Sequence, residues 1–132
     1  MLVFVTKEIG RKVVALSTQY QDLNHHNFNK RSNYTISSVK RIISTSTIAC
    51  HLLPFPKALF YCHRMPQTRV FQAALAGEDG RNLMSTMVVC HMDTSTWNPS
   101  HIAFKQVHLT PSSTTSICHI LLDTDVMWVS VV

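Results

Sequence analysis

The sequence predicts a mainly β fold of the α+β class, an antiparallel, sheet-rich single domain. At 132 residues and 15.0 kDa the chain has the size of one domain, and its 45% hydrophobic content supplies a core. Short β-rich segments follow one another through the C-terminal half. Their connections are too short for helical crossovers, so the strands are expected to pair antiparallel. This composition excludes a disordered tail and a coiled coil.

The N-terminal half carries the weaker structural signals. Apolar residues alternate at Tyr34, Ile36 and, less strictly, Val39, which is typical of a strand. The predicted elements are a helix through Lys12, a strand over 13–17, a polar loop over 21–33, a strand over 34–43 and, after an extended entry with Pro54 and Pro56, a buried strand over 58–63.

The C-terminal half begins with the clearest local signal. Residues 68–76 and 82–93 flank the sequence GEDG, which predicts two strands joined by a four-residue turn, a β-hairpin. A second turn is expected at Trp97-Asn98-Pro99, because proline disfavours the helical region for the residue before it. Three further β-rich segments are predicted, over 101–109, 117–122 and 126–132.

The net charge of +5 is unevenly distributed. Ten of the twelve Lys and Arg residues but only two acids occur through Arg69, a distribution that would suit nucleic acid, an acidic polysaccharide or a membrane surface. The bases occur singly or in pairs without interleaved aromatic residues, which favours a solvated basic face and no nucleic-acid partner. No segment approaches the roughly 18 apolar residues that span a membrane. The opening residues also lack the features of an export signal.

All four cysteines directly precede a histidine, in a chain with eight histidines. Random placement would give this roughly once in 100,000 sequences. Neighbouring side chains on a strand point to opposite faces, so each Cys and its His are expected to have different roles. The histidines could converge on copper, zinc or iron, and the cysteines could form two disulfides with three possible connectivities. A mixed Cys/His metal site at a strand end and buried free cysteines beside ordinary histidines remain alternatives.

Two further residues are candidates near these pairs. His101 would serve as an additional ligand or a proton-transfer group, or as an ordinary surface turn histidine. Asp93 would orient a ligating imidazole, or fix a turn through Asp93-Thr94-Ser95. The sequence contains no G-x-S-x-G, H-E-x-x-H or P-loop motif, so it gives no support to a hydrolase.

The spacing of the four pairs resembles a known family signature. The pattern CH-x10-CH-x26-CH-x26-CH, together with FPKALFYCH, LAGEDG, VVCHMDTSTWNPSHIAF and VMWV, resembles the plant BURP domain over essentially the whole chain. The resemblance implies that residues 1–132 form an N-terminally truncated, incomplete BURP domain with its Cys-His repeat region over 50–119. The remainder of the domain, with its own cysteine pair and a secretory signal, would lie upstream. Asp125 departs from the family pattern, because a histidine is frequent at this position.

The resemblance also implies a cofactor and a location. Copper is the expected cofactor, the candidate ligands are His51, His63, His91 and His119, and Cys50, Cys62, Cys90 and Cys118 are disulfide partners or alternative ligands. The expected location is the apoplast or cell wall, with a wall polysaccharide or a wall enzyme as partner. The family includes seed and stress-responsive proteins, a non-catalytic subunit associated with a pectin-degrading enzyme, and copper-dependent peptide cyclases that crosslink aromatic side chains. Because the chain has no room for a core peptide, we favour a metal-binding domain without catalysis of its own over a cyclase. An inactive truncated product is the third alternative.

Overall fold

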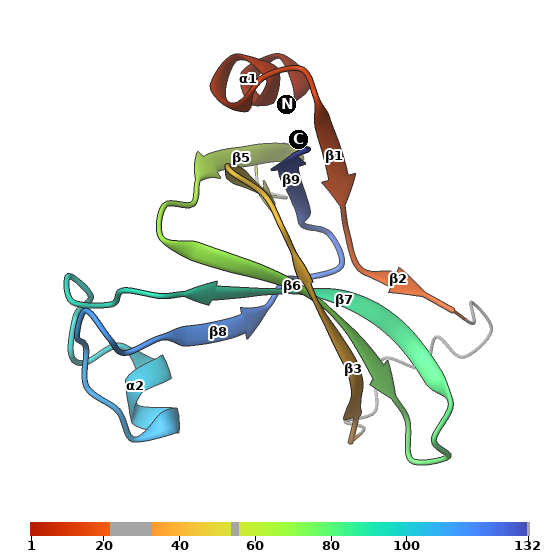
Figure 1. Cartoon of the computed structure of the whole chain (residues 1–132), viewed down its shortest axis with the longest axis vertical. Coiled ribbons are helices and arrows are strands. Elements are labelled where there is room, and N and C mark those ends of the chain that lie inside the picture. The colour runs from red at the N-terminus through yellow and green to blue at the C-terminus, as the bar shows by residue number, and fades with distance from the viewer. Residues whose placement is uncertain (22–32, 54–55, 132) are drawn as a thin grey trace.

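The computed structural model describes residues 1–21, 33–53 and 56–131, and they form two antiparallel β sheets (Figure 1). The mainly β prediction is therefore confirmed. The first sheet has the strand order β1 (Val13–Leu16), β9 (Val126–Ser130), β4 (Thr47–Leu53), β5 (Leu59–Arg64). The second sheet has the order β2 (Gln19–Tyr20), β7 (Asn82–His91), β6 (Thr68–Ala76), β3 (Thr35–Ile42), and β8 (Ile117–Ile120) pairs with β7.

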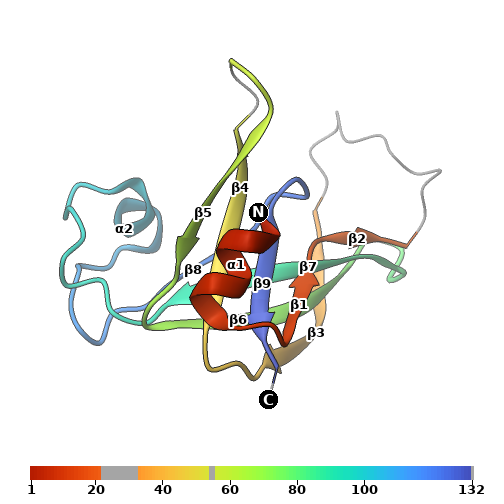
Figure 2. The ribbon, with the colours of Figure 1, turned by 90° about the horizontal axis from the view of Figure 1, so that it is seen from above.

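The main hydrophobic core lies between the two sheets. The first sheet contributes Ala49, Met127 and Val129, and the second contributes Val70, Met87 and Val89, all of them buried. Alternate residues of each strand face this core, as the period-two pattern requires. A second, smaller cluster lies on the outer face of the first sheet, where helix α1 (Leu2–Ile9) packs over β4 and β9 (Figure 2).

The predicted hairpin forms between β6 and β7. Its turn is closed by backbone hydrogen bonds from Gly77 N–H to Arg81 C=O and from Gly80 N–H to Gly77 C=O. Gly80 has a φ of 76°, a conformation that glycine adopts without steric cost. The predicted turn at Asn98 is also confirmed, with His101 N–H donating to the Asn98 carbonyl.

The helical regions differ from the sequence prediction in two places. Residues 101–109 were predicted to be β-rich, but helix α2 (Ile102–Val107) forms there. The imidazole of His101 caps this helix by accepting from Ala103 N–H, and Phe104 at its centre is buried. At the N-terminus, α1 ends at Ile9 rather than Lys12, because Gly10 follows with a φ of 89°. Among the described residues no helix is long and apolar enough to cross a membrane.

The strand predicted over 58–63 is present as β5, but the prediction that it is buried is wrong. Leu59, Phe60 and Tyr61 are 48%, 40% and 57% exposed. The reason is that β5 is an edge strand with β4 as its neighbour in the sheet. Residues 22–32 of the loop predicted over 21–33, and Pro54 of the predicted extended entry, lie outside the described residues. Strands are confirmed at 13–16, 35–42, 117–120 and 126–130.

Candidate metal centre

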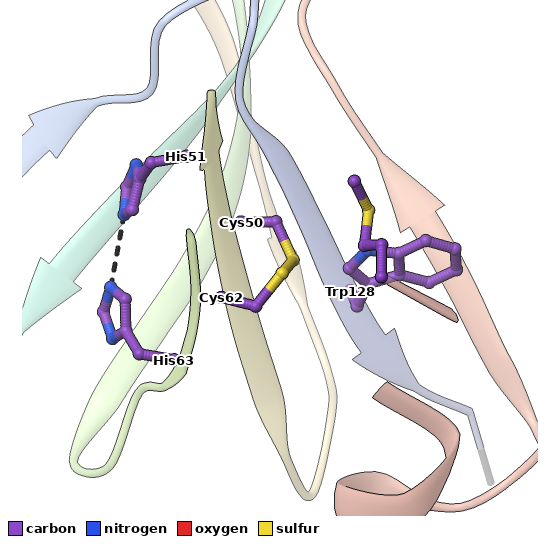
Figure 3. The surroundings of a disulfide bond; sticks show 6 residues. Cys50, His51, Cys62, His63 and Trp128 are labelled. Atoms are coloured by element: carbon purple, nitrogen blue, oxygen red, sulfur yellow. Dashed lines mark hydrogen bonds between the residues drawn. A yellow bond between two sulfur atoms is a disulfide. The ribbon is translucent and has the colours of Figure 1, made fainter. Parts of the chain in front are cut away.

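The first two Cys-His pairs form one cross-strand unit, which we call the first Cys-His unit (Cys50, His51, Cys62 and His63). Cys50 and Cys62 lie directly opposite each other on β4 and β5 and form a disulfide, with Cα atoms 4.0 Å apart. His51 and His63 lie diagonally across the same two strands, and their Nε2 atoms are 3.2 Å apart. Figure 3 shows the disulfide on the side of Trp128 and the imidazoles on the other side of the strands.

The last two pairs form a second Cys-His unit (Cys90, His91, Cys118 and His119) with the same register. Cys90 and Cys118 face each other on β7 and β8 and form the second disulfide. The Nε2 atoms of His91 and His119 are 3.3 Å apart. The expectation that Cys and His face opposite ways is therefore confirmed in both units. Of the three possible connectivities, the structure has the one that joins cysteines of neighbouring pairs.

Both imidazole pairs project from the inner faces of their sheets. On β4, His51 is two residues from Ala49 of the main core, and on β7, His91 is two residues from Val89 of the same core. Burial lowers the pKa of His91, and the charges of His119 and His63 lower it further. His63 lies on β5 of the first sheet and His91 on β7 of the second.

The structure brings the four candidate histidine ligands together two by two. Over residues 1–21, 33–53 and 56–131, no group of three or more His, Cys, Asp or Glu side chains has an arrangement that could hold a metal ion. All four cysteine sulfur atoms are in disulfides, so no thiolate is present as an alternative ligand. Each unit thus offers two imidazole nitrogens, and a site that joins both pairs stays a prediction.

Hydrogen bonds in the first unit fix where its protons lie. His51 Nδ1 is 3.1 Å from Asp125 Oδ2, and His63 Nδ1 is 3.0 Å from the Arg64 carbonyl oxygen. A carboxylate and a carbonyl only accept hydrogen bonds, so both Nδ1 atoms carry a proton. In neutral imidazoles both Nε2 atoms then hold lone pairs, which face each other across 3.2 Å. Such a pair needs a cation, either a shared proton or a metal ion.

The spacing of the nitrogen atoms fits metal coordination. Two imidazole nitrogens bound to one tetrahedral ion at about 2.0–2.1 Å are separated by about 3.3–3.4 Å. The Nε2 separations of 3.2 and 3.3 Å in the two units are close to this value. Imidazole is a suitable ligand for copper, zinc, iron and nickel. The two imidazoles of each unit therefore have a spacing that fits copper, the metal that the family resemblance implies.

His101 and Asp93 have other contacts in the structure. His101 caps α2, and its ring contacts Trp97, which in turn packs edge-on against His91. One carboxylate oxygen of Asp93 accepts from both the backbone N–H and the hydroxyl of Ser95, and these bonds lower the pKa of Asp93. These are the contacts of a helix cap and of a turn. Roles of His101 and Asp93 around a metal stay predictions.

Sequence reasoning missed the partner of His51. Asp125 was noted as a departure from the family pattern, but nothing in its spacing connected it with His51. The β4–β9 register makes that connection, because Cys50 is opposite Val126 and the next residues along, His51 and Asp125, are therefore adjacent. Tyr61 was also missed, and its ring stacks on His63 at a centroid distance of 5.7 Å.

Comparison with known proteins gives a consistent result. The family model described as the BURP domain matches residues 1–130. The BURP domain protein RD22 of Arabidopsis thaliana is 35% identical over 98% of the chain, and the BURP domain protein USPL1 of the same species is 38% identical over 74%. The polygalacturonase-1 non-catalytic subunit beta of Solanum lycopersicum is 33% identical over 97%. The chain spans 32%, 35% and 20% of the lengths of these three relatives.

Proposed function

The chain belongs to the BURP domain family of plant proteins, and on this premise we propose that it is a copper-binding domain of an extracellular, wall-associated protein, without catalysis of its own. The observation that carries the proposal is the pair of facing Nε2 atoms in the first Cys-His unit. Their Nδ1 protons are held by the Asp125 carboxylate and the Arg64 carbonyl, so the Nε2 lone pairs point at one position from two paired strands.

The two units have separate tasks within this proposal. Each disulfide fixes the register of two strands, and the fixed register places two imidazoles diagonally on the inner face. His51 and His63 would hold the ion from one sheet, and His91 and His119 from the other. Copper is preferred to zinc because divalent ions in nitrogen sites follow the Irving–Williams order. When bound, copper would supply a redox-active centre beside the core.

A copper titration of the purified chain with its disulfides intact tests this proposal. We expect copper to bind more tightly than zinc, and His63→Ala to remove much of the copper affinity. His108→Asn is a matched control, because His108 lies outside both units and has a φ of 54°, which asparagine tolerates. Equal copper affinity in the wild type, His63→Ala and His108→Asn would refute the metal site.

The same protein also tests the absence of catalysis. The copper-loaded chain is incubated in air with an aromatic-rich peptide, and the peptide is examined for the loss of two hydrogens by mass spectrometry. We expect no loss. A loss that depends on His63 would replace the non-catalytic proposal with that of a copper-dependent peptide cyclase.

The proposed location has two supports. Two disulfides are typical of proteins from oxidising compartments. One relative is named as a non-catalytic subunit of a polygalacturonase, and the excess of basic residues through Arg69 would suit an acidic wall polysaccharide. Co-sedimentation with polygalacturonate measures this directly. We expect binding at low ionic strength that weakens as salt is added. No binding at low ionic strength would contradict the polysaccharide as a partner and leave a wall enzyme.

A further inference from the structure

Asp125 is a buried carboxylate beside the first Cys-His unit. It lies in the turn before β9 and is 5% exposed. Its backbone N–H donates to the Leu122 carbonyl, and its Oδ2 accepts from the Leu122 N–H at 3.3 Å. The same Oδ2 is 3.1 Å from His51 Nδ1. The side chain is therefore fixed by its own turn before it contacts the histidine.

We infer that Asp125 is a positioning residue that makes His51 a metal ligand, an inference that rests on the proposed function. Asp125 holds the proton of His51 on Nδ1 and leaves the Nε2 lone pair directed at His63. The negative charge of the carboxylate lies across the same ring and also favours a cation at Nε2 electrostatically. Asp125 is not itself a ligand, because its Oδ2 contacts the Nδ1 side of the ring, away from Nε2.

The effect of Asp125 follows from counting donors in the pair. Without it, the His51 proton could move to Nε2 and be donated directly to the Nε2 of His63. The pair would then be satisfied by one neutral hydrogen bond and would need no cation. With Asp125 present, that tautomer would place the Nδ1 lone pair against a carboxylate. Asp125 thereby prevents the two imidazoles from satisfying each other.

The second unit shows the arrangement without this constraint on its first histidine. His119 Nδ1 is 3.4 Å from the Ile120 carbonyl, which corresponds to the bond between His63 and Arg64. Among the described residues, the side chain that His91 contacts besides His119 is the indole of Trp97, and the two ring centroids are 5.0 Å apart. His91 can donate from Nε2 to His119 at 3.3 Å. Asp125 therefore distinguishes the first unit as the stronger metal-binding pair.

The experiment combines two measurements on the full chain with its disulfides intact. Imidazole ¹⁵N chemical shifts of the metal-free protein report which nitrogen of each histidine carries the proton, and a copper titration reports affinity. In Asp125→Ala we expect His51 to lose the Nδ1–H form and copper affinity to fall about 10- to 100-fold. His63 should keep its Nδ1–H form, because its partner is the Arg64 carbonyl. Asp123→Ala is the matched control, since this carboxylate lies in the same turn but bonds to Tyr20.

Asp125→Asn is the second variant, because Asp125→Ala leaves Leu122 N–H without its acceptor and could prevent folding. The amide oxygen can accept both bonds of Oδ2, so the tautomer should be kept while the negative charge is lost. Copper should bind more weakly than to the wild type. Wild-type affinity in folded Asp125→Ala would overturn the inference, and wild-type affinity in Asp125→Asn would overturn the part of it that rests on the carboxylate charge. If the wild type binds no copper, the proposed function fails by itself. In that case the positioning role is still tested by the chemical shifts. It is supported if His51 has the Nδ1–H form in the wild type and loses it in Asp125→Ala, and it is refuted if His51 keeps the Nδ1–H form in Asp125→Ala.

Discussion

The two Cys-His units have the same strand geometry but different surroundings. In both, opposed cysteines form a disulfide on one face, and diagonal histidines meet through Nε2 on the other. The first unit adds a buried carboxylate at His51, whereas the second adds the indole of Trp97 at His91. The comparison shows that a repeated sequence pattern specifies a strand arrangement. Under the proposed function, the neighbouring elements decide which of the two arrangements binds a cation more strongly.

The outer faces of the two units also differ. Cys50 is fully buried in the cluster beneath α1, with Val5 and Ile48. In the second disulfide Cys90 is also buried, at 7% exposure, but Cys118 on β8 is exposed. Both disulfides therefore contribute to packing as well as to chain connectivity, and the first contributes more to packing.

The largest expected effect is on stability, from removing either disulfide. The double variant Cys50→Ala/Cys62→Ala removes a crosslink between residues 12 apart in the sequence, which should lower the free energy of unfolding by about 3 kcal/mol. The lost contacts of the buried sulfur atoms should lower it by about 1 kcal/mol more. The double variant Cys90→Ala/Cys118→Ala removes a crosslink between residues 28 apart. The loss of this crosslink alone should lower the free energy of unfolding by about 3.6 kcal/mol. Urea unfolding measures both. Losses below about 1 kcal/mol would show that the disulfides do not support the strand pairs.

Removing each imidazole pair tests the comparison at the inner faces. The double variant His51→Ala/His63→Ala should weaken copper binding by more than about 100-fold. The loss of one residue that only contacts a ligand costs up to about that much, and this variant removes two ligands. His91→Ala with His119→Ala should have the smaller effect, because that pair can satisfy itself with a neutral hydrogen bond. Affinities are compared by titration against a competing chelator. The opposite order would mean that Asp125 does not set the difference between the units.

His91 of the second unit contributes to the pH dependence of stability. Burial lowers the folded-state pKa of His91 below its ordinary value of 6.5, so the unfolded chain binds more protons at this position as the pH falls. The metal-free protein should lose stability as the pH drops through 6.5 and gain nothing from this group at higher pH. His91→Gln should flatten this part of the profile measured by urea unfolding. An unchanged slope would contradict the assignment.

The smallest effect is expected at Asp93. Its carboxylate accepts hydrogen bonds from Ser95, so Asp93→Ala should lower stability only slightly and leave copper affinity unchanged. The readouts are urea unfolding and the copper titration. A clear loss of affinity would restore the hypothesis that Asp93 orients a ligating imidazole.

The sequence predicted those features that depend on local alternation. Opposite facing of Cys50 and His51 follows from the strand period alone, and the hairpin follows from the glycines around its turn. The pairing of His51 with His63 depends on the register between β4 and β5, and no local sequence pattern predicts that register. The contact with Asp125 depends in the same way on β9.

Helix α2 could not be predicted for a different reason. A six-residue helix has little stability of its own, so the residues that form it carry no strong periodic signal. Its stability comes from burial of Phe104 and from the His101 cap, which are tertiary and terminal effects. The apolar residues at 101–109 therefore resembled a strand.

The central claim is that the facing imidazoles of the two units bind copper, with the first unit dominant. X-ray absorption spectroscopy of the copper-loaded chain, compared with His51→Ala/His63→Ala and His91→Ala/His119→Ala at equal copper loading, tests it most directly. The account predicts imidazole scattering in the wild-type spectrum that is lost or strongly reduced in the first variant and reduced less in the second. A wild-type spectrum without imidazole scattering, or one that both variants leave unchanged, would contradict it.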